Sequence, residues 1–261
     1  YHPDTLKQIL CLRKHLLARR AAGSEDAADR WLAMVATNRL TGHSPGFLSV
    51  YTLPPNQAVS PKRQILINQR LKQAPEFRDL PSILLKKSRQ LLGGLSAQEI
   101  SHLRSAAKSA LLLTHSADST PELEPGSVAL VVTSPPFLDI VQYKDDNWLR
   151  CWFNGIDSDS IAANLTMSRT VEAWTESMKK VFFELFRVLK PGGRVAFEVG
   201  EVRKGSIRLE EHAEAAGRNA GLSCERILIN TQNFTKTSNI WGVSNNSRGT
   251  NSNRIVIFIK K

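Results

Sequence analysis

The chain of 261 residues is poor in cysteine, and its hydrophobic residues form no long uninterrupted run. Its three cysteines, Cys11, Cys151 and Cys224, are far apart, and no CxxC pair or other metal-ligand spacing occurs. This pattern argues against a disulfide framework and against a metal site, and it favours a reducing, cytoplasmic setting. Because a membrane-spanning helix needs about 20 consecutive apolar residues, the sequence predicts no membrane partner.

Negative charge is also scarce, with 24 acidic residues against 35 basic residues and a formal net charge of +11. Such an excess favours a polyanionic partner, most simply nucleic acid, although a solvated basic surface would look the same in the composition. Many of the basic residues fall between residues 62 and 92: Lys62, Arg63, Arg70, Lys72, Arg78, Lys86, Lys87 and Arg89.

The first part of the chain, residues 1–95, reads as helical. Apolar residues recur at helical spacing in residues 5–22, where Asp4 or Thr5 is the expected N-cap, and a second helix is expected in residues 26–40. Glycine and proline then interrupt the periodicity, so we expect an extended loop followed by helical pieces broken at Pro75 and Pro81.

From residue 96 onward the pattern changes to alternating strands and helices. The expected helices are 96–109, capped by Ser96, then 174–190 and 209–222; the expected strands are 110–116, 127–133, 194–202, 224–232 and 254–261. This alternation predicts an α/β sheet with crossover connections. Residues 127–133 are almost wholly apolar, as in a strand covered on both faces. Ligands of such sheets bind at the carboxyl ends of the strands.

One such strand end carries an unusually stiff corner. In the stretch VVTSPPFLDIVQY, Ser134 is followed by Pro135, Pro136 and Phe137. Because proline restricts the backbone, the carbonyls of Ser134 and Pro135 are held beside a hydroxyl group and an aromatic face. This set suits an exocyclic amino group on a planar ring. The alternative is an ordinary tight turn whose phenylalanine belongs to the core.

The stretch VALVVTSPPF resembles the catalytic motif of amino-group DNA methyltransferases, which carry Asp, Asn or Ser before Pro-Pro and an aromatic residue. The flanking stretches ADSTPELEPG and FRVLKPGGRVAFEVGEV stand in the order and at the distances that this family uses. The resemblance covers about residues 110–261 well. It implies a Rossmann-like methyltransferase core in residues 96–261 and a variable, possibly target-recognising segment in residues 1–95, where the match is weaker.

The resemblance implies methyl transfer from S-adenosylmethionine to the N4 amino group of a cytosine flipped out of double-stranded DNA, as in restriction-modification systems. In the motif Ser134-Pro135-Pro136-Phe137, the Ser134 hydroxyl and the Pro135 carbonyl would bind the amino group, and Phe137 would stack on the base. No metal is required. The serine form of the motif leans toward cytosine, and N6 of adenine is the alternative.

Further site residues follow from the same resemblance. Asp118 and Thr133 would contact the cofactor, although Asp118 also suits a turn. Tyr143 would flank the flipped base. The polar segment 235–254, with Lys236, Arg248 and Arg254, suits phosphate and base contacts, although a long hairpin loop would have the same composition. Residues 43–92 are the other candidate for target recognition.

The sequence also departs from the family. The cofactor-binding loop of the form FxGxG is absent, and no acidic residue that ends the second strand can be identified. If residues 110–116 form the third strand, the first two strands should precede Tyr1. Three explanations remain open: the chain is a piece of a longer protein, a partner chain supplies the missing part, or the protein is an inactive relative that binds nucleic acid. An RNA base methyltransferase is a further alternative.

Overall fold

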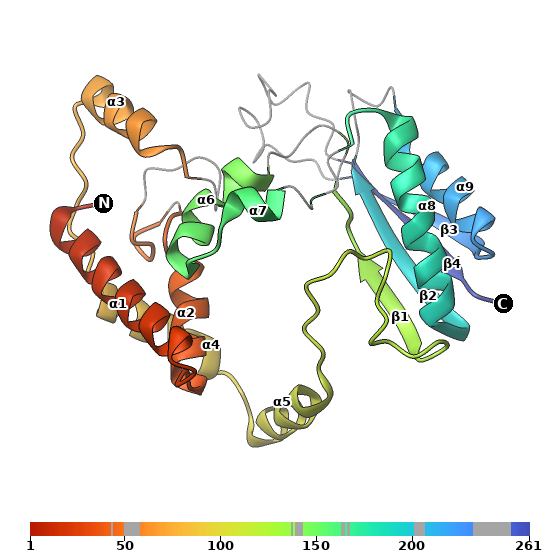
Figure 1. The fold of residues 1–261 in the computed structure, drawn as a ribbon, viewed down its shortest axis with the longest axis horizontal. Helices are drawn as coiled ribbons and strands as arrows, with labels where there is room; N and C mark the ends of the chain where they lie inside the picture. Colours follow the sequence, from red (N-terminus) through yellow and green to blue (C-terminus); the bar gives the residue numbers. More distant parts are fainter. Residues whose placement is uncertain are drawn as a thin grey trace. The chain divides into compact units, whose positions relative to one another are not determined.

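The computed structural model in Figure 1 describes residues 1–42, 44–49, 58–136, 138, 143–162, 165, 168–200, 207–231 and 252–261. The chain divides into two compact units. Unit 1 contains residues 1–110 and 142–165, and unit 2 contains residues 111–141 and 166–261. The segment 142–165, which we expected in the catalytic core, therefore clusters with the N-terminal helices. The assignment of residues 1–95 and 96–261 to functional domains stays a prediction.

Unit 1 is helical in the part that the structure describes. Its helices are α1 (Pro3–Ala21), α2 (Ala27–Thr37), α3 (Pro61–Leu71), α4 (Leu80–Leu92), α5 (Ala97–Ser109), α6 (Tyr143–Asn154) and α7 (Ser158–Ala162). Helices α1, α2, α4 and α6 pack together around a core that includes Ile9, Leu16, Val35, Leu84 and Phe153. The N-terminal helical segment predicted from the sequence is confirmed.

The helix ends of unit 1 follow local sequence signals with two exceptions. Ser96 and Glu99 form the capping box that begins α5, as expected. At α1, however, the cap is the His2 ring, which accepts a hydrogen bond from the backbone N–H of Asp4. Thr5 is instead buried and donates to the Arg78 carbonyl at 2.8 Å. Pro81 lies in the first turn of α4, where proline costs no hydrogen bond, so it begins this helix rather than interrupting it.

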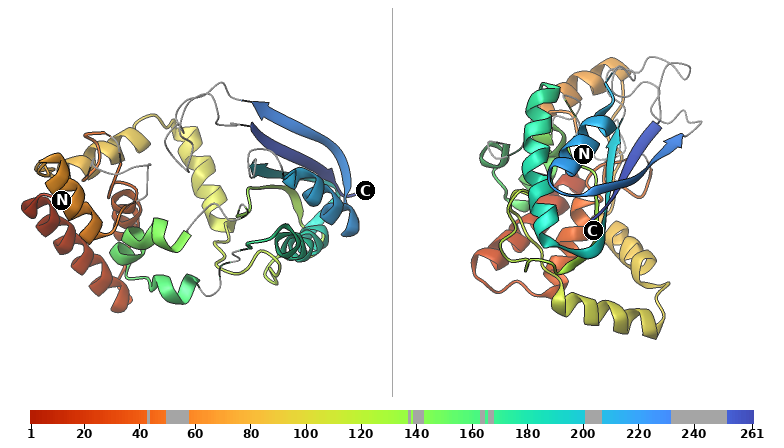
Figure 2. Two further views of the ribbon diagram at one scale, coloured as in Figure 1. Left: turned by 90° about the horizontal axis from the view of Figure 1, so that it is seen from above. Right: turned by 90° about the vertical axis from the view of Figure 1, so that its right-hand side faces the viewer.

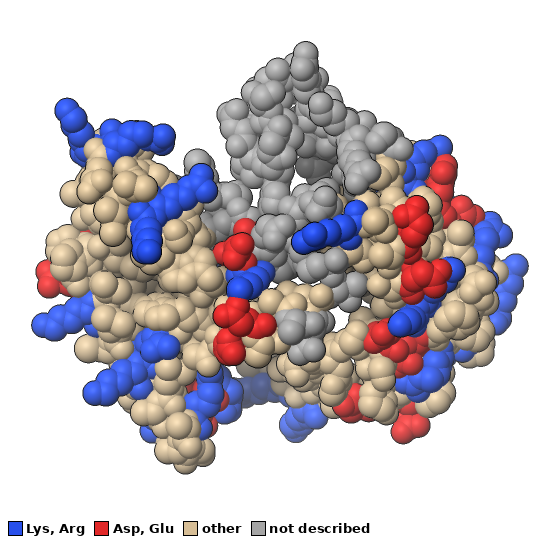
Figure 3. Space-filling model, turned by 45° about the horizontal axis from the view of Figure 1, so that its top comes forward, with Lys and Arg blue, Asp and Glu red and all other residues tan. Residues whose placement is uncertain are grey.

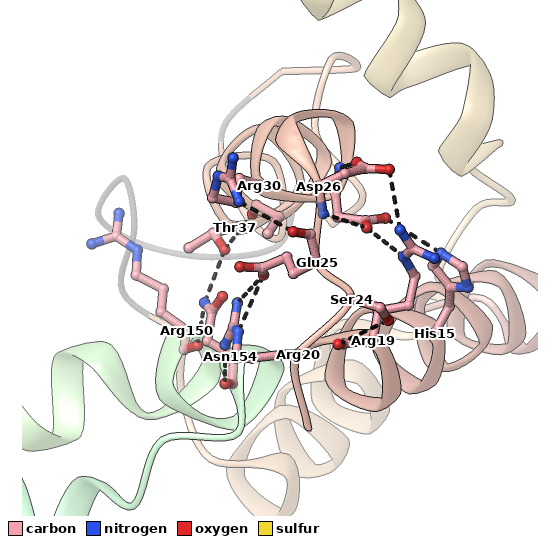
Figure 4. Close-up of polar contacts among 12 residues, drawn as sticks. His15, Arg19, Arg20, Ser24, Glu25, Asp26, Arg30, Thr37, Arg150 and Asn154 are labelled. Carbon is pink, nitrogen blue, oxygen red and sulfur yellow. Dashed lines mark hydrogen bonds and ion pairs between the residues drawn. The ribbon is translucent and has the colours of Figure 1, made fainter. Parts of the chain in front are cut away.

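A polar network explains why α6 belongs with the first two helices (Figure 4). The Asn154 side chain of α6 donates to the Thr37 hydroxyl of α2 at 2.9 Å, and Arg20 of α1 donates to the Asn154 carbonyl at 3.1 Å. Arg19 of α1 pairs with the buried Asp29 of α2 and lowers the pKa of that carboxyl group. The two contacts of Asn154 join segments that are more than a hundred residues apart in the sequence.

Unit 2 has a mixed α/β fold, which confirms the predicted fold class. Its sheet contains β1 (Val128–Thr133), β2 (Leu189–Gly200), β3 (Ser223–Thr231) and β4 (Ser252–Ile259), in the order β1-β2-β4-β3. Strand β1 runs parallel to β2, whereas β4 is antiparallel to both β2 and β3. Helices α8 (Val171–Val188) and α9 (Leu209–Asn219) pack side by side on one face of this sheet (Figure 2).

The core of unit 2 lies between the sheet and these two helices. Phe182 of α8 is fully buried, and its ring centroid lies 4.7 Å from that of Phe197 in β2 and 5.1 Å from that of Phe258 in β4. Aromatic pairs at such distances prefer offset or edge-to-face arrangements, and these rings are tilted in that way. The apolar periodicity of α8 and the alternation in β2 therefore meet in one aromatic cluster.

Two expectations for unit 2 are wrong. Residues 110–127 form no helix or strand, and Leu112 in the expected strand 110–116 is 95% exposed. A strand needs a hydrogen-bonding neighbour, and among the described strands β1 pairs with β2 alone. The expectation that both faces of β1 are covered is also wrong, because no described element packs on the face that carries Leu130 and Val132, which are 59% and 75% exposed.

None of the described helices combines the length and the apolar composition that crossing a bilayer requires. Within the same residues, no group of three or more His, Cys, Asp and Glu side chains is placed to hold a metal ion.

Candidate active site

The corner Ser134-Pro135-Pro136 follows directly on β1, at the carboxyl end of this strand. Thr133, the last residue of β1, is half-buried and pairs in register with Phe197 of β2. The corner therefore starts from a strand whose position is set by the parallel ladder with β2. This is the edge of the sheet at which α/β proteins place their ligands.

The corner is anchored by a residue that the sequence analysis missed. Trp174, in the first turns of α8, is 2% exposed, and its indole N–H donates to the Pro136 carbonyl at 3.0 Å. On the other side of the corner Leu138 is 1% exposed and belongs to the same hydrophobic core. A buried tryptophan needs a partner for its N–H group, and this requirement is the signal that could have pointed to Trp174.

The anchoring leaves two oxygen atoms of the corner without a hydrogen-bond partner among the described residues. Ser134 is exposed, and no described residue bonds its hydroxyl group or the carbonyl of Pro135. The two prolines remove two backbone donors and restrict the backbone of the residues before them. The result is a pair of oxygen acceptors at the strand end, which suits a ligand with N–H donors.

Asp118 lies in a turn on the segment that leads into β1. Two residues further on, the backbone N–H of Thr120 donates to the Glu184 carboxylate of α8 at 2.8 Å. Arg187 bonds the same carboxylate at 2.7 Å and the carbonyls of Thr120 and Leu123 at 2.9 Å each. The Arg187 guanidinium, followed by the Thr120 contacts, lowers the pKa of Glu184 to about 2.

The site on α8 where Glu184 and Arg187 bind the segment around Thr120 is distant from Trp174, the residue of the same helix that anchors the corner. Ten residues separate Glu184 from Trp174, which corresponds to about 15 Å of helix rise. No hydrogen bond joins Asp118 to the corner among the described residues. The role of Asp118 in cofactor binding stays a prediction, and so does that of Thr133.

The expected substrate contacts are placed in different ways. The Arg254 guanidinium lies 2.8 Å from the carboxylate of Glu210, which is 3% exposed at the start of α9. The structure thus gives Arg254 a structural ion pair, and its contact with substrate stays a prediction. Tyr143 is the first residue of α6 in unit 1, and its side chain is not described. Phe137, Lys236 and Arg248 lie outside the described residues.

Trp148, which follows Tyr143 in α6, belongs to the core of unit 1. The indole N–H of Trp148 donates to the Ala58 carbonyl at 2.6 Å, and its ring packs against the buried cluster of that unit. With its neighbours Leu149 and Trp152, Trp148 therefore belongs to the packing of unit 1.

The described residues do not by themselves make a complete site for S-adenosylmethionine. Thr133 and Ser134 place a hydroxyl pair at the strand end, but no glycine-rich turn follows a strand and opens a helix, the arrangement that would let a backbone approach a nucleotide-like cofactor closely. The outer edge of β1 has no strand beside it among the described residues.

No family model matches this chain, and no curated protein matches it. Among solved structures, it is similar to a proposed DNA modification methylase, TTHA0409 from Thermus thermophilus, in complex with S-adenosyl-L-methionine. The identity is 23%, the match covers 56% of this chain and 54% of that chain, and the TM-score is 0.36. A SAM-dependent methyltransferase from Methanosarcina mazei is 10% identical over 63% of this chain and 78% of its own, with a TM-score of 0.30.

The chain thus spans about half the length of the Thermus thermophilus protein. At these identities and TM-scores the similarities assign the chain neither a family nor an activity.

Proposed function

We propose that this chain carries the catalytic corner of an S-adenosylmethionine-dependent DNA methyltransferase that acts on the N4 amino group of cytosine in a flipped base. The observation that carries the proposal is the anchored corner. Trp174 holds the Pro136 carbonyl, while the Ser134 hydroxyl and the Pro135 carbonyl are bonded by no described residue at the carboxyl end of β1. Together with the motif TSPPF, this geometry supports amino-group chemistry over an ordinary turn.

The residues of the corner would act by orientation. The Ser134 hydroxyl and the Pro135 carbonyl accept hydrogen bonds from the two N–H groups of the cytosine amine and turn its lone pair out of the ring plane. S-adenosylmethionine would supply the electrophilic methyl group when bound. As the nitrogen becomes positively charged, the two oxygens stabilise it, and the amino proton leaves to solvent. Such preorganised oxygens contribute through geometry and electrostatics rather than through strong basicity.

The cofactor site would be completed from outside the described residues. The sequence lacks an FxGxG loop, and the outer edge of β1 has no strand partner among the described residues, while Leu130 and Val132 are exposed on one face of the same strand. We propose that a further segment, or a partner chain, pairs with this edge and brings the cofactor loop. An inactive relative that binds nucleic acid through the same fold is the second candidate, and the incomplete cofactor site is the observation that favours it.

Labelled S-adenosylmethionine and duplex DNA test the proposal, with the chain supplied alone and together with any residues that its gene encodes upstream of Tyr1. The DNA is digested to nucleosides, and the product is identified by mass and chromatography. N4-methylcytosine is expected. N6-methyladenine would overturn the base assignment but keep the mechanism, and methylated RNA without methylated DNA would overturn the substrate.

Other products bear on the mechanism itself. 5-Methylcytosine would overturn it, because carbon methylation requires a nucleophile such as a cysteine thiolate, and the corner contains none. Failure of both preparations to bind the cofactor would support the inactive relative.

A serine pair provides the matched variants. Ser134→Ala should lower methyl transfer about a hundredfold, as loss of one preorganised hydrogen-bonding group does. Ser127→Ala, at the opposite end of β1, removes a hydroxyl that donates to the Glu124 carbonyl, and it should leave the rate unchanged. Equal rates for the two variants would contradict the role of Ser134.

A further inference from the structure

Helix α3 carries an unusual surface for a helix of a folded domain. None of its 11 residues is buried, and its sequence PKRQILINQRL contains three cations and no carboxylate. Figure 3 shows Lys and Arg side chains gathered at the upper left, over this helix, without acidic side chains among them. Because none of its residues is buried, α3 gains little stability from hydrophobic packing. Its exposed cationic surface is therefore the feature that requires an explanation.

The cations of α3 lie together on one face. With 3.6 residues per turn, Lys62, Arg63 and Arg70 fall within an arc of roughly 100°. The opposite face, with Gln64, Ile65 and Asn68, lines a cavity of about 530 Å³ in unit 1 that Trp148 and Trp152 also border. The helix thus turns its amide and apolar side toward its own unit, and its cationic face points away from it.

These cations are not neutralised within the described part of the chain. No described residue forms an ion pair or a hydrogen bond with the side chain of Lys62, Arg63 or Arg70. Between residues 61 and 92 the sequence contains two acids, Glu76 and Asp79. Glu76 pairs with Arg78 at 2.6 Å, and Asp79 caps α4.

Several cations of unit 2, by contrast, are paired. Lys179 binds Glu176, Arg194 binds Glu225 and Arg218 binds Glu214, the latter two at 2.9 and 2.7 Å. The contrast separates α3 from an ordinary solvated basic surface, in which acidic side chains are interspersed.

We propose that the cationic face of α3 docks on the phosphate backbone of duplex DNA and positions it on unit 1. The proposal rests on DNA being the substrate of the proposed methyltransferase, and it names the element that holds this substrate. Lys62 and Arg70 are eight residues apart, which is about 12 Å along the helix, so the three cations can reach two or three phosphates of one strand. Contacts of this kind fix position and carry no base sequence.

The arrangement of α3 favours DNA over a membrane surface. A helix that lies on a bilayer must present its apolar face to the lipid. Here Ile65, although 56% exposed, borders the cavity of unit 1 and not the cationic face. A bilayer docked on the cationic face would therefore meet three cations, with Leu66 as the apolar side chain among them.

Salt dependence of DNA binding tests the proposal on the full chain. The variant Lys62→Gln, Arg63→Gln, Arg70→Gln is compared with Lys179→Gln, Arg194→Gln, Arg218→Gln, which removes the same charge from paired cations. Binding to a fluorescent duplex is measured by anisotropy between about 50 and 200 mM salt, the range in which such slopes are large. Each phosphate contact contributes about 0.9 to the slope of log affinity against log salt.

The α3 variant should lose about 2 to 3 units of this slope, whereas the paired-cation variant should lose less than about one. Equal losses would overturn the proposal, because net charge alone would then explain binding. Binding of phosphatidylserine vesicles that depends on α3, without binding of DNA, would overturn it in favour of a membrane. Lack of methyl transfer alongside α3-dependent DNA binding would leave the docking helix standing and would count only against the proposed reaction.

Discussion

Glu184 shows how one side chain can hold a long irregular segment in place. Its carboxylate accepts hydrogen bonds from Thr120, and Arg187 joins it to the carbonyls of Thr120 and Leu123. These contacts fasten the connection between residues 111 and 127, which has no regular structure of its own, to α8. The Glu184 carboxyl is therefore ionised in the folded protein well into acid, with a pKa of about 2.

This lowered pKa predicts a pH dependence with a definite sign. A carboxyl group whose folded pKa lies below its ordinary value of 4.5 stabilises the fold above pH 4.5, and the stabilisation is lost as the pH falls toward 2. Glu184→Gln should therefore lower the stability of unit 2 at neutral pH and flatten its acid dependence between pH 4.5 and 2. Urea unfolding at several pH values measures both effects.

Glu176→Gln is the control for this prediction. Glu176 lies on the same helix with its side chain 67% exposed, in an ion pair with Lys179. Its replacement should change little, because exposed ion pairs contribute about 0–1 kcal/mol. An acid dependence that is the same for wild type and Glu184→Gln would contradict the assigned role.

Strand β1 shows which features of an element can be predicted from the sequence and which cannot. Its position could be predicted because six residues of a strand-forming sequence precede a proline corner that no helix could continue. The elements that surround it could not be predicted, because apolar residues indicate a preference for burial but do not show which neighbouring element buries them. Val131 faces the core of unit 2, whereas Val132 is 75% exposed.

The same limit applies to other elements. The capping box of α5 and the apolar spacing of α8 are local signals, so both helices were predicted. The bond from Trp174 to Pro136 and the pairing of Arg254 with Glu210 join residues that are distant in sequence. Such contacts depend on how elements pack: a buried tryptophan is expected to need a hydrogen-bond partner, but no pattern in the sequence identifies Pro136 as that partner. The leucines of residues 110–116 show the converse case. Their local sequence predicts a strand, but no strand forms because no described strand lies beside them to pair with.

A valine pair in adjacent strands tests the description of β1. Val132→Thr should change the free energy of unfolding by less than about 0.5 kcal/mol, because the side chain is exposed. Val195→Thr in β2, where the side chain is fully buried, should cost about 1–3 kcal/mol through an unpaired hydroxyl group. Both values come from urea unfolding. A cost for Val132→Thr as large as that for Val195→Thr would mean that a further element covers β1.

At the level of the whole molecule, the described residues form two hydrophobic cores that share no buried residue. Phe153 is 2% exposed in the core of unit 1, and Phe182 is fully buried in the core of unit 2. Each core is built from segments that are discontinuous in sequence, because the chain leaves unit 1 and returns to it. Two cores of this kind predict two unfolding transitions rather than one.

Calorimetry of two phenylalanine variants tests this prediction. Phe153→Ala should lower the transition temperature of unit 1, and Phe182→Ala should lower that of unit 2. Each substitution should reduce the free energy of unfolding of its own unit by about 3–5 kcal/mol, the usual cost of removing a buried ring. Each variant serves as the control for the other. If both substitutions move one common transition by similar amounts, the units are a single cooperative structure.

The sheet order β1-β2-β4-β3 also governs when unit 2 can assemble. Strand β4 lies between β2 and β3, yet it follows both of them in the chain, and β3 pairs with β4 alone among the described strands. During synthesis β3 therefore has no edge to join until residues 252–259 have been made, so the pair β1-β2 and the strand β3 wait as separate apolar pieces. The pairing of β2 with β4 also joins residues that are far apart in the chain, such as Gly200 and Asn253, and long-range pairing of this kind slows folding. The nascent chain is most exposed to misassociation during this interval.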